Sequence, residues 1–285
     1  HRLTHQRAPG TGWEYIIYDK LDRPALVQDA RMRLNDQWLL TTYDAFSRPV
    51  YTGLYEPSIG GDLTSIQNVV NAQSQLNESR TPSSNSFGGG SAYYSNTVFP
   101  TGDITLHTVS YFDSYTNEAL TVLPPSVYNK NIITTVKSLP TESKVRVLGN
   151  NDWITTITGY DDKRRPIFGI TSNSYLNTED TSESLLDFTG KVLESRTTHQ
   201  KTNQPTIVTK DYFTYDHQQR LLAHTQQIDD EPLQLISNNI YDEIGQLVTK
   251  DVGGQLFESG YTDITAGRID ISEEGVITKT YGTSA

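Results

Sequence analysis

Six aspartates stand in one recurring local context, and they are the residues of this sequence that could do chemistry. Each belongs to an eight-residue unit, Tyr-Asp-x-x-(Gly)-Arg/Lys/Gln-apolar-apolar, with Leu in place of Tyr in one copy. The copies are YDKLDRPA, YDAFSRPV, YDDKRRPI, LDFTGKVL, YDHQQRLL and YDEIGQLV. Carboxylates can act as acid and base when their environments differ. Here the environments are alike, so we expect turn capping rather than catalysis and assign no catalytic residue. The repeat residues are Tyr18, Asp19, Tyr43, Asp44, Tyr160, Asp161, Leu186, Asp187, Gly190, Tyr215, Asp216, Tyr241, Asp242 and Gly245.

The spacing of the units predicts a series of β-hairpins. Consecutive units begin 25 residues apart at Tyr18 and Tyr43, and 26, 29 and 26 residues apart from Tyr160 onward. In each unit the aspartate is expected to accept a hydrogen bond from the backbone two residues on, an Asx-turn. The fifth position suits a left-handed backbone and is occupied by Gly190 and Gly245 in two units. Arg164 and Gln219 tolerate that conformation poorly, which predicts longer or differently bent turns there.

A stripe of arginines follows the turns, at Arg23, Arg48, Arg165 and Arg220. Such a stripe could bind phosphate or carboxylate ligands. We expect it instead to pair with the aspartates of neighbouring units.

Other candidate sites are weaker. His1 and His5 have a metal-like spacing, and His217 and His224 flank one predicted turn, but both pairs lack further ligands, so neither a metal nor a cofactor is expected. The Gly88–Gly90 run lacks the lysine of a phosphate loop and is interpreted as a linker. Trp13, Trp38 and Trp153 could form a platform for carbohydrate, although packed cross-strand aromatics are the favoured interpretation.

Composition excludes several classes of protein. The formal net charge of −11 argues against binding to nucleic acid or to anionic membrane. No apolar run is long enough to span a bilayer. The absence of cysteine excludes disulfides, zinc-thiolate sites and thiol nucleophiles. The chain begins at His1 without a signal-like segment, so we interpret it as an internal or processed piece.

These elements predict an all-β fold in which repeated hairpins form a curved or spiralling sheet with a short helical insertion. Residues 1–53 and 103–253 are the hairpin regions, and each hairpin covers the edge of the one before it. Residues 54–102 are an insertion, with a helix expected over 62–76 capped by Asp62 and a flexible Ser/Gly-rich loop over 77–92. Strands are expected at 104–113 and within 136–162, and SYTNEALT as a variant hairpin. Residues 254–285 are β-like, with turn glycines that include Gly260, Gly267, Gly275 and Gly282.

The repeat resembles that of the YD-repeat, or Rhs-repeat, proteins, and especially their large bacterial surface-exported branch. WLLTTYDAFSRPVYTGLY, LLDFTGKVLESRTTHQ and NNIYDEIGQLVTKDVGG are among the stretches that carry the resemblance, which covers roughly residues 15–250. The resemblance implies a long β-ribbon coiling into a hollow shell, as in teneurins and insecticidal toxin complexes. The family's autocleaving core, with its catalytic aspartates, has no convincing counterpart in this sequence, so no proteolytic activity carries over.

Two functions are therefore expected for this chain. The first is a non-enzymatic segment of a secreted or cell-surface bacterial protein, exported by a type IX-like route, that encloses or presents a C-terminal toxin-like segment. Its partners would be flanking repeats, the enclosed segment and the secretion machinery. The alternative is a surface adhesin that binds glycans through exposed aromatics. A hydrolase site in the insertion is the weakest interpretation, because the insertion supplies no nucleophile or metal set.

Overall fold

The computed structural model describes residues 3–57, 62–253, 267–271 and 277–280, the last two stretches as backbone alone. The chain divides into two compact units. The first unit comprises His1–Val122, Thr134–Ile157 and Asn173–Tyr175, and the second comprises Leu123–Ile133, Thr158–Ser172 and Leu176–Ala285. Both are built from antiparallel strands, with three short helices among the described residues, so the predicted all-β class is confirmed. No helix in the described ranges is long and apolar enough to cross a membrane.

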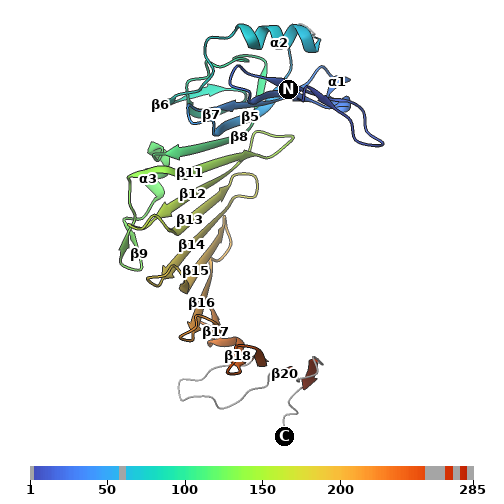
Figure 1. Cartoon of the computed structure of the whole chain (residues 1–285). Helices are drawn as coiled ribbons and strands as arrows, with labels where there is room; N and C mark the ends of the chain where they lie inside the picture. Colours follow the sequence, from blue (N-terminus) through green and yellow to red (C-terminus); the bar gives the residue numbers. More distant parts are fainter. Residues whose placement is uncertain (1–2, 58–61, 254–266, 272–276, 281–285) are drawn as a thin grey trace. The chain divides into compact units, whose positions relative to one another are not determined.

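The first unit is a sheet in which strands pair with their neighbours along the chain (Figure 1). Its strands are β1 (His5–Gln6), β2 (Glu14–Tyr18), β3 (Pro24–Gln28), β4 (Trp38–Tyr43), β5 (Pro49–Tyr55), β8 (Ile104–Asp113), β11 (Val136–Arg146) and β12 (Trp153–Tyr160). Every pairing in this order is antiparallel. The strands predicted at 104–113 and within 136–162 are confirmed. One extra turn of helix, α1 (Ala30–Arg33), separates β3 from β4.

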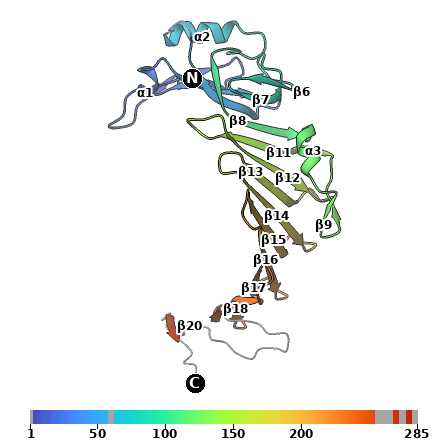
Figure 2. The ribbon, with the colours of Figure 1, turned by 180° about the vertical axis from the view of Figure 1, so that it is seen from behind.

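The insertion packs on the first unit through α2 (Leu63–Ala72). The predicted N-cap is confirmed, because Asp62 accepts a hydrogen bond from Ser65 N at 2.7 Å. The helix ends at Ala72, four residues before the predicted end. Ile66 and Val70 are its buried residues, and they join the core formed by the hairpin strands. In Figure 2 the helix lies over the end of the unit that carries the first hairpins.

Residues 77–92 differ from the flexible loop that their composition predicts. They contribute to a β-hairpin of β6 (Arg80–Phe87) and β7 (Gly90–Tyr94). Gly88 and Gly89 both have positive φ angles, 58° and 71°, as a tight two-residue hairpin turn requires. Because Tyr93 and Tyr94 are buried in the core, the hairpin is fixed by packing that its Ser- and Asn-rich outer residues do not reveal.

The segment after β8 also departs from the prediction. SYTNEALT contributes to a short helix, α3 (Asn117–Val122), rather than a variant hairpin. Thr116 Oγ1 accepts from Ala119 N at 3.1 Å and so holds the start of this helix. A two-residue hairpin follows, with β9 (Ser126–Val127) and β10 (Lys130–Asn131).

The second unit continues the antiparallel pattern. Its strands include β13 (Pro166–Asn173), β14 (Thr178–Leu186), β15 (Val192–Lys201), β16 (Ile207–Tyr215), β17 (Leu221–Ile228), β18 (Gln234–Tyr241), β19 (Leu247–Val252), β20 (Gly267–Ile271) and β21 (Ile277–Thr280). From β14 to β21 each strand pairs with the next. The tail is therefore β-structured where it is described. Of its predicted turn glycines, Gly260, Gly275 and Gly282 lie outside the described residues.

The two units bury their residues differently. The large buried core cluster lies in the first unit, where Trp38, Tyr51 and Leu106 are among its members. In β14, β15, β16 and β17 no residue is fully buried, on either face of the strands. Polar residues meet across these strands, as where Thr181 lies opposite Thr198. This four-strand region is a sheet layer whose two faces both keep contact with solvent.

Candidate functional site

In each of the six repeated turns, hydrogen bonds join the aspartate to the residue that ends the turn. We number them 1 to 6 by Asp19, Asp44, Asp161, Asp187, Asp216 and Asp242; turns 1 and 2 belong to the first unit and the others to the second. In each, the aspartate N–H donates to the carbonyl of the residue four positions on. The carboxylate accepts from that same residue's N–H in all six turns, at 2.7–3.0 Å.

The predicted Asx-turn bond is present as well. The aspartate carboxylate accepts from the N–H two residues on in turns 1, 2, 3, 4 and 6, at 2.8–3.1 Å. One carboxylate thus satisfies backbone donors that the chain reversal would otherwise leave unpaired.

The fifth position of every turn has a left-handed backbone. Its φ angles are 64° at Asp22, 61° at Ser47, 64° at Arg164, 101° at Gly190, 69° at Gln219 and 89° at Gly245. The prediction that turns 3 and 5 would be longer or differently bent is wrong. A left-handed residue other than glycine costs about 1–2 kcal/mol, and the several hydrogen bonds to one carboxylate outweigh that cost.

The arginine of each turn pairs with the aspartate of its own turn. Nε donates to the Asp Oδ2 at 2.7 Å in turns 1 and 2, 2.8 Å in turn 3 and 2.6 Å in turn 5. The expected pairing with aspartates of neighbouring units is therefore wrong. The reason is local, because a side chain that opens the return strand lies directly beside the aspartate that begins the turn. Arg48 additionally bonds Asp113, at the end of β8.

Basic side chains of turns 1, 4 and 5 also cover the tyrosine ring of the next turn in their unit. Arg23 Cζ lies 4.6 Å from the Tyr43 ring centroid, and Arg220 Cζ lies 4.5 Å from that of Tyr241. In turn 4 a lysine makes the equivalent contact, since Lys191 Nζ lies 4.5 Å from the ring centroid of Tyr215 in turn 5. These cation–π contacts join one hairpin to the next.

Tyrosine hydroxyls also join consecutive hairpins, by hydrogen bonds to the preceding turn. The hydroxyls of Tyr43, Tyr215 and Tyr241 each donate to the carbonyl of the residue that follows the basic residue of the preceding turn. The pairs are Tyr43 with Pro24 at 2.8 Å, Tyr215 with Val192 at 2.9 Å and Tyr241 with Leu221 at 3.0 Å. This role of the tyrosine was not predicted, although the recurrence of a basic residue after one turn and a tyrosine before the next is the signal that could have revealed it.

Turn 1 is covered by the insertion. Arg23 donates through Nη2 to the Leu76 carbonyl at 2.6 Å and through Nη1 to Asn77 Oδ1 at 3.0 Å. The Glu78 N–H donates to the Tyr43 carbonyl at 2.8 Å. Arg23 is accordingly 8% exposed, against 24% for Arg220 in turn 5.

The carboxylates of turns 3, 4 and 5 are held ionised. Burial raises the pKa of Asp161 and of Asp216, but hydrogen bonds from the amide and guanidinium of the following arginine outweigh it and lower the pKa overall. The Thr189 hydroxyl is the main cause of the lowered pKa of Asp187. These carboxylates act as fixed acceptors, and a group that stays charged at neutral pH is poorly suited to donate a proton.

The described histidines do not form a cluster that could bind a metal ion. His1 lies outside the described residues, and His5 contacts Thr4 and the edge of Trp13. His217 is exposed on turn 5. His224 lies on β17, where its ring stacks on Phe213 at 4.5 Å and bonds Asp211 at 2.7 Å. Among the residues that the structure describes, no group of three or more His, Asp or Glu side chains could hold a metal ion.

The tryptophans form no common platform. Trp38 is 1% exposed and belongs to the core of the first unit. Trp153 packs so closely on Gly90 that a Cβ there would lie 2.6 Å from the indole. Trp13 is exposed. The large exposed aromatics at turn tips are instead Phe46 and Phe188.

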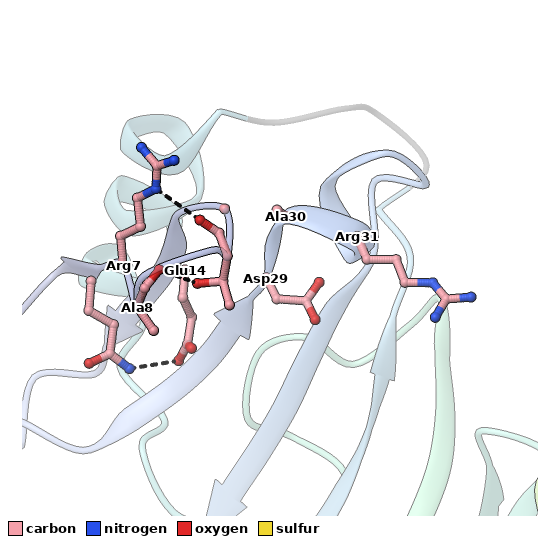
Figure 3. A pocket seen from close by; sticks show the side chains of 9 residues that line it. Arg7, Ala8, Glu14, Asp29, Ala30 and Arg31 are labelled. Atoms are coloured by element: carbon pink, nitrogen blue, oxygen red, sulfur yellow. Dashed lines mark hydrogen bonds between the residues drawn. The ribbon is translucent and has the colours of Figure 1, made fainter.

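A cavity of about 590 Å³ lies between the first hairpin and α1 (Figure 3). Arg7, Glu14, Asp29 and Arg31 line it. Asp29 caps α1 by accepting from Met32 N, and Glu14 accepts from Gln6. In Figure 3 the guanidinium groups of Arg7 and Arg31 point away from each other. The cavity thus presents charged groups that serve local structure rather than a paired acid and base.

Comparison of the chain with known proteins identified no relative. No protein family model matches the chain, and no curated protein is similar to it in sequence.

Proposed function

We propose that this chain is a non-enzymatic segment of a large secreted protein of the YD-repeat, or Rhs, family, and forms part of a β-shell that encloses or presents a C-terminal, toxin-like segment. The observation that carries the proposal is the interlocked turn. One turn geometry recurs six times, and its aspartates, arginines and tyrosines are engaged in hydrogen bonds and cation–π contacts with one another and with the backbone. Side chains engaged in such structural contacts are typical of a scaffold rather than of a catalytic site.

The four-strand layer of β14 to β17 in the second unit supports the same proposal. A layer without a buried core gains stability from its neighbours along the sheet, so a chain of such hairpins favours extension by flanking repeats. A shell wall needs that property, whereas an enzyme needs a closed pocket with convergent polar groups. The bacterial cell surface, or secretion by a type IX-like route, is the location that goes with this proposal.

Electron microscopy of the full-length protein tests the proposal. We expect a closed shell around an internal cavity, with density for the enclosed segment. A solid particle without a cavity would contradict it.

A second candidate is a glycan-binding adhesin. The observation that favours it is the exposure of Trp13, Phe46, Tyr175 and Phe188. Glycan-array binding that is lost in Trp13→Ala or Phe46→Ala, with the fold intact, would support it. Trp38→Ala is unsuitable for this test, because the buried Trp38 would report on stability instead. A blank array would count against the adhesin.

A further inference from the structure

The turn between β11 and β12 and the neighbouring strand β8 form an open pocket of about 300 Å³ in the first unit. Thr105 and His107 of β8 line one side of the pocket, and Arg146 and residues 148–151 line the other. The volume lies at the lower end of the range in which proteins bind small molecules. None of the lining residues belongs to the six repeated turns, so the repeat does not explain the pocket.

Arg146 is the cation of this pocket, and it has no carboxylate partner among the residues that the structure describes. Its Nε donates to the Asn150 carbonyl at 2.9 Å, its Nη1 to the Gly88 carbonyl at 3.3 Å, and its Nη2 to Asn151 Oδ1. The arginines of the repeated turns, in contrast, each bond an aspartate. The side chain of Arg146 is half-buried and its bond to Asn151 is exposed. A guanidinium has five N–H groups, so Nη1 and Nη2 each keep a donor for a ligand.

His107 lines the pocket together with Arg146 and has no hydrogen bond to another described residue. It is the extra residue of a β-bulge, because the β5 partners of Leu106 and Thr108 are consecutive residues. Such bulges change the direction of a side chain and are frequent beside functional sites. Burial, and then the charge of Arg146, lower the pKa of His107, so the ring is uncharged at neutral pH and offers one N–H donor.

Two asparagine side chains supply further donors. Asn150 Oδ1 accepts from Asp152 N at 2.9 Å, and Asn151 Oδ1 accepts from Arg146, so both amide oxygens are engaged and both NH₂ groups remain available. Leu148, which is 74% exposed, adds an apolar surface. No acidic side chain is among the described residues that line the pocket, although the chain as a whole carries a net charge of −11.

We infer that this pocket is a binding site for a hexuronate, a sugar that carries a carboxylate. Arg146 and His107 hold the carboxylate, and the amides of Asn150 and Asn151 hold the ring hydroxyls. A bare carboxylate would leave the amide donors and the apolar surface of Leu148 unused. The inference goes beyond the shell function and does not depend on it, and it requires none of the exposed aromatic side chains of an adhesin.

Titration of the ¹⁵N-labelled full chain with sodium glucuronate and with sodium galacturonate, followed by NMR, tests the inference. We expect saturable shifts of the side-chain amide signals of Asn150 and Asn151, with a Kd of about 1 mM or below for at least one of the two sugars. The uncharged amides of these sugars lack the carboxylate, and acetate lacks the ring. Each should bind at least about tenfold more weakly.

Asn151→Asp tests the role of the charge. The aspartate keeps the Oδ1 acceptor that Arg146 uses, so the melting temperature should be unchanged or higher, but Arg146 then has a carboxylate partner within the chain. Hexuronate binding should weaken at least about tenfold. Asn203→Asp is the matched control, because it makes the same change in charge on the exposed turn between β15 and β16 and should keep the affinity.

His107→Ala should weaken binding by about fivefold, the value of one hydrogen bond. The inference is overturned if neither sugar binds at about 10 mM, if acetate or the sugar amides bind as tightly as the hexuronates, or if Asn151→Asp keeps the parent affinity. Equal weakening by Asn203→Asp would overturn it too, since net charge rather than this pocket would then govern binding. A full-length particle without a cavity would remove the shell function and leave the binding result standing.

Discussion

Arg164 and Gln219 adopt left-handed backbones that ordinary side chains avoid, and the aspartate three residues before each explains how. Asp161 and Asp216 fix the turn through hydrogen bonds to the N–H groups that follow them. The backbone strain is therefore imposed by one carboxylate. Gly190 and Gly245 occupy the same position without that strain.

Gln219→Gly should stabilise the second unit by roughly 1 kcal/mol, because glycine removes the steric cost of a φ of 69°. Urea unfolding followed by circular dichroism measures the change. Gln218→Gly is the control, since residue 218 has no positive φ to relieve and the substitution should be neutral or destabilising. A Gln219→Gly variant less stable than the parent would show that the glutamine side chain contributes more than the strain costs.

Asp242→Ala should lower stability by about 1 kcal/mol more than Asp230→Ala does. Asp242 accepts from Ile244 N and Gln246 N, whereas Asp230 lies exposed between β17 and β18. The two variants change charge equally, so their difference isolates the capping bonds. Equal melting temperatures would contradict the capping role.

At the scale of elements, a reciprocal pair of contacts joins turn 1 to turn 2, turn 4 to turn 5, and turn 5 to turn 6. A basic side chain covers the next tyrosine, and that tyrosine donates its hydroxyl back across the strand pair. Because both contacts need the same register, a one-residue slip of a strand would break them together. The insertion contacts turn 1 through the same basic residue, because Arg23 donates hydrogen bonds to Leu76 and Asn77.

Arg23→Lys should therefore destabilise the first unit far more than Arg220→Lys destabilises the second. Lysine cannot replace the contacts to Leu76 and Asn77, and the loss should be about 2 kcal/mol for a buried, charge-assisted set. Hydrogen exchange would locate the effect, with α2 losing protection first. Equal changes in the two variants would mean that the insertion is held by α2 packing alone.

The local parts of this structure could be predicted from sequence, and the parts that depend on neighbours could not. Asp62 as a helix cap and the aspartates as turn caps were predictable, because their partners lie two to four residues away. The Ser/Gly-rich hairpin was missed because its burial comes from Tyr93 and Tyr94 packing on distant strands. The partners of the arginines were mistaken although they are only four residues away, because the hairpin sets the direction of the arginine side chain.

At the scale of the whole molecule, acid should weaken the fold through the turn aspartates. The pKa values of Asp161, Asp187 and Asp216 are lowered in the folded state. Their contribution is complete above the unfolded value of about 3.9 and is lost as the pH falls through the folded values. Urea midpoints measured between neutral pH and pH of about 3 should fall steeply only at the acid end.

Asp161→Asn should flatten that acid decline, because a residue that cannot ionise has no proton to take up on unfolding. Asp162→Asn, at the exposed neighbouring position, is the control and should leave the decline steeper than Asp161→Asn does. Identical pH profiles for the two variants would mean that the turn carboxylates do not drive the acid response.

The solvated layer of β14 to β17 has a thermal consequence. Unfolding a sheet with no fully buried residue exposes little new apolar surface, and apolar exposure is the source of the heat-capacity increment. That increment should lie below the usual figure of about 12–15 cal/mol/K per residue. The stability of this four-strand layer should then vary little between cold and warm conditions, while the first unit follows the ordinary curved dependence of a cored domain.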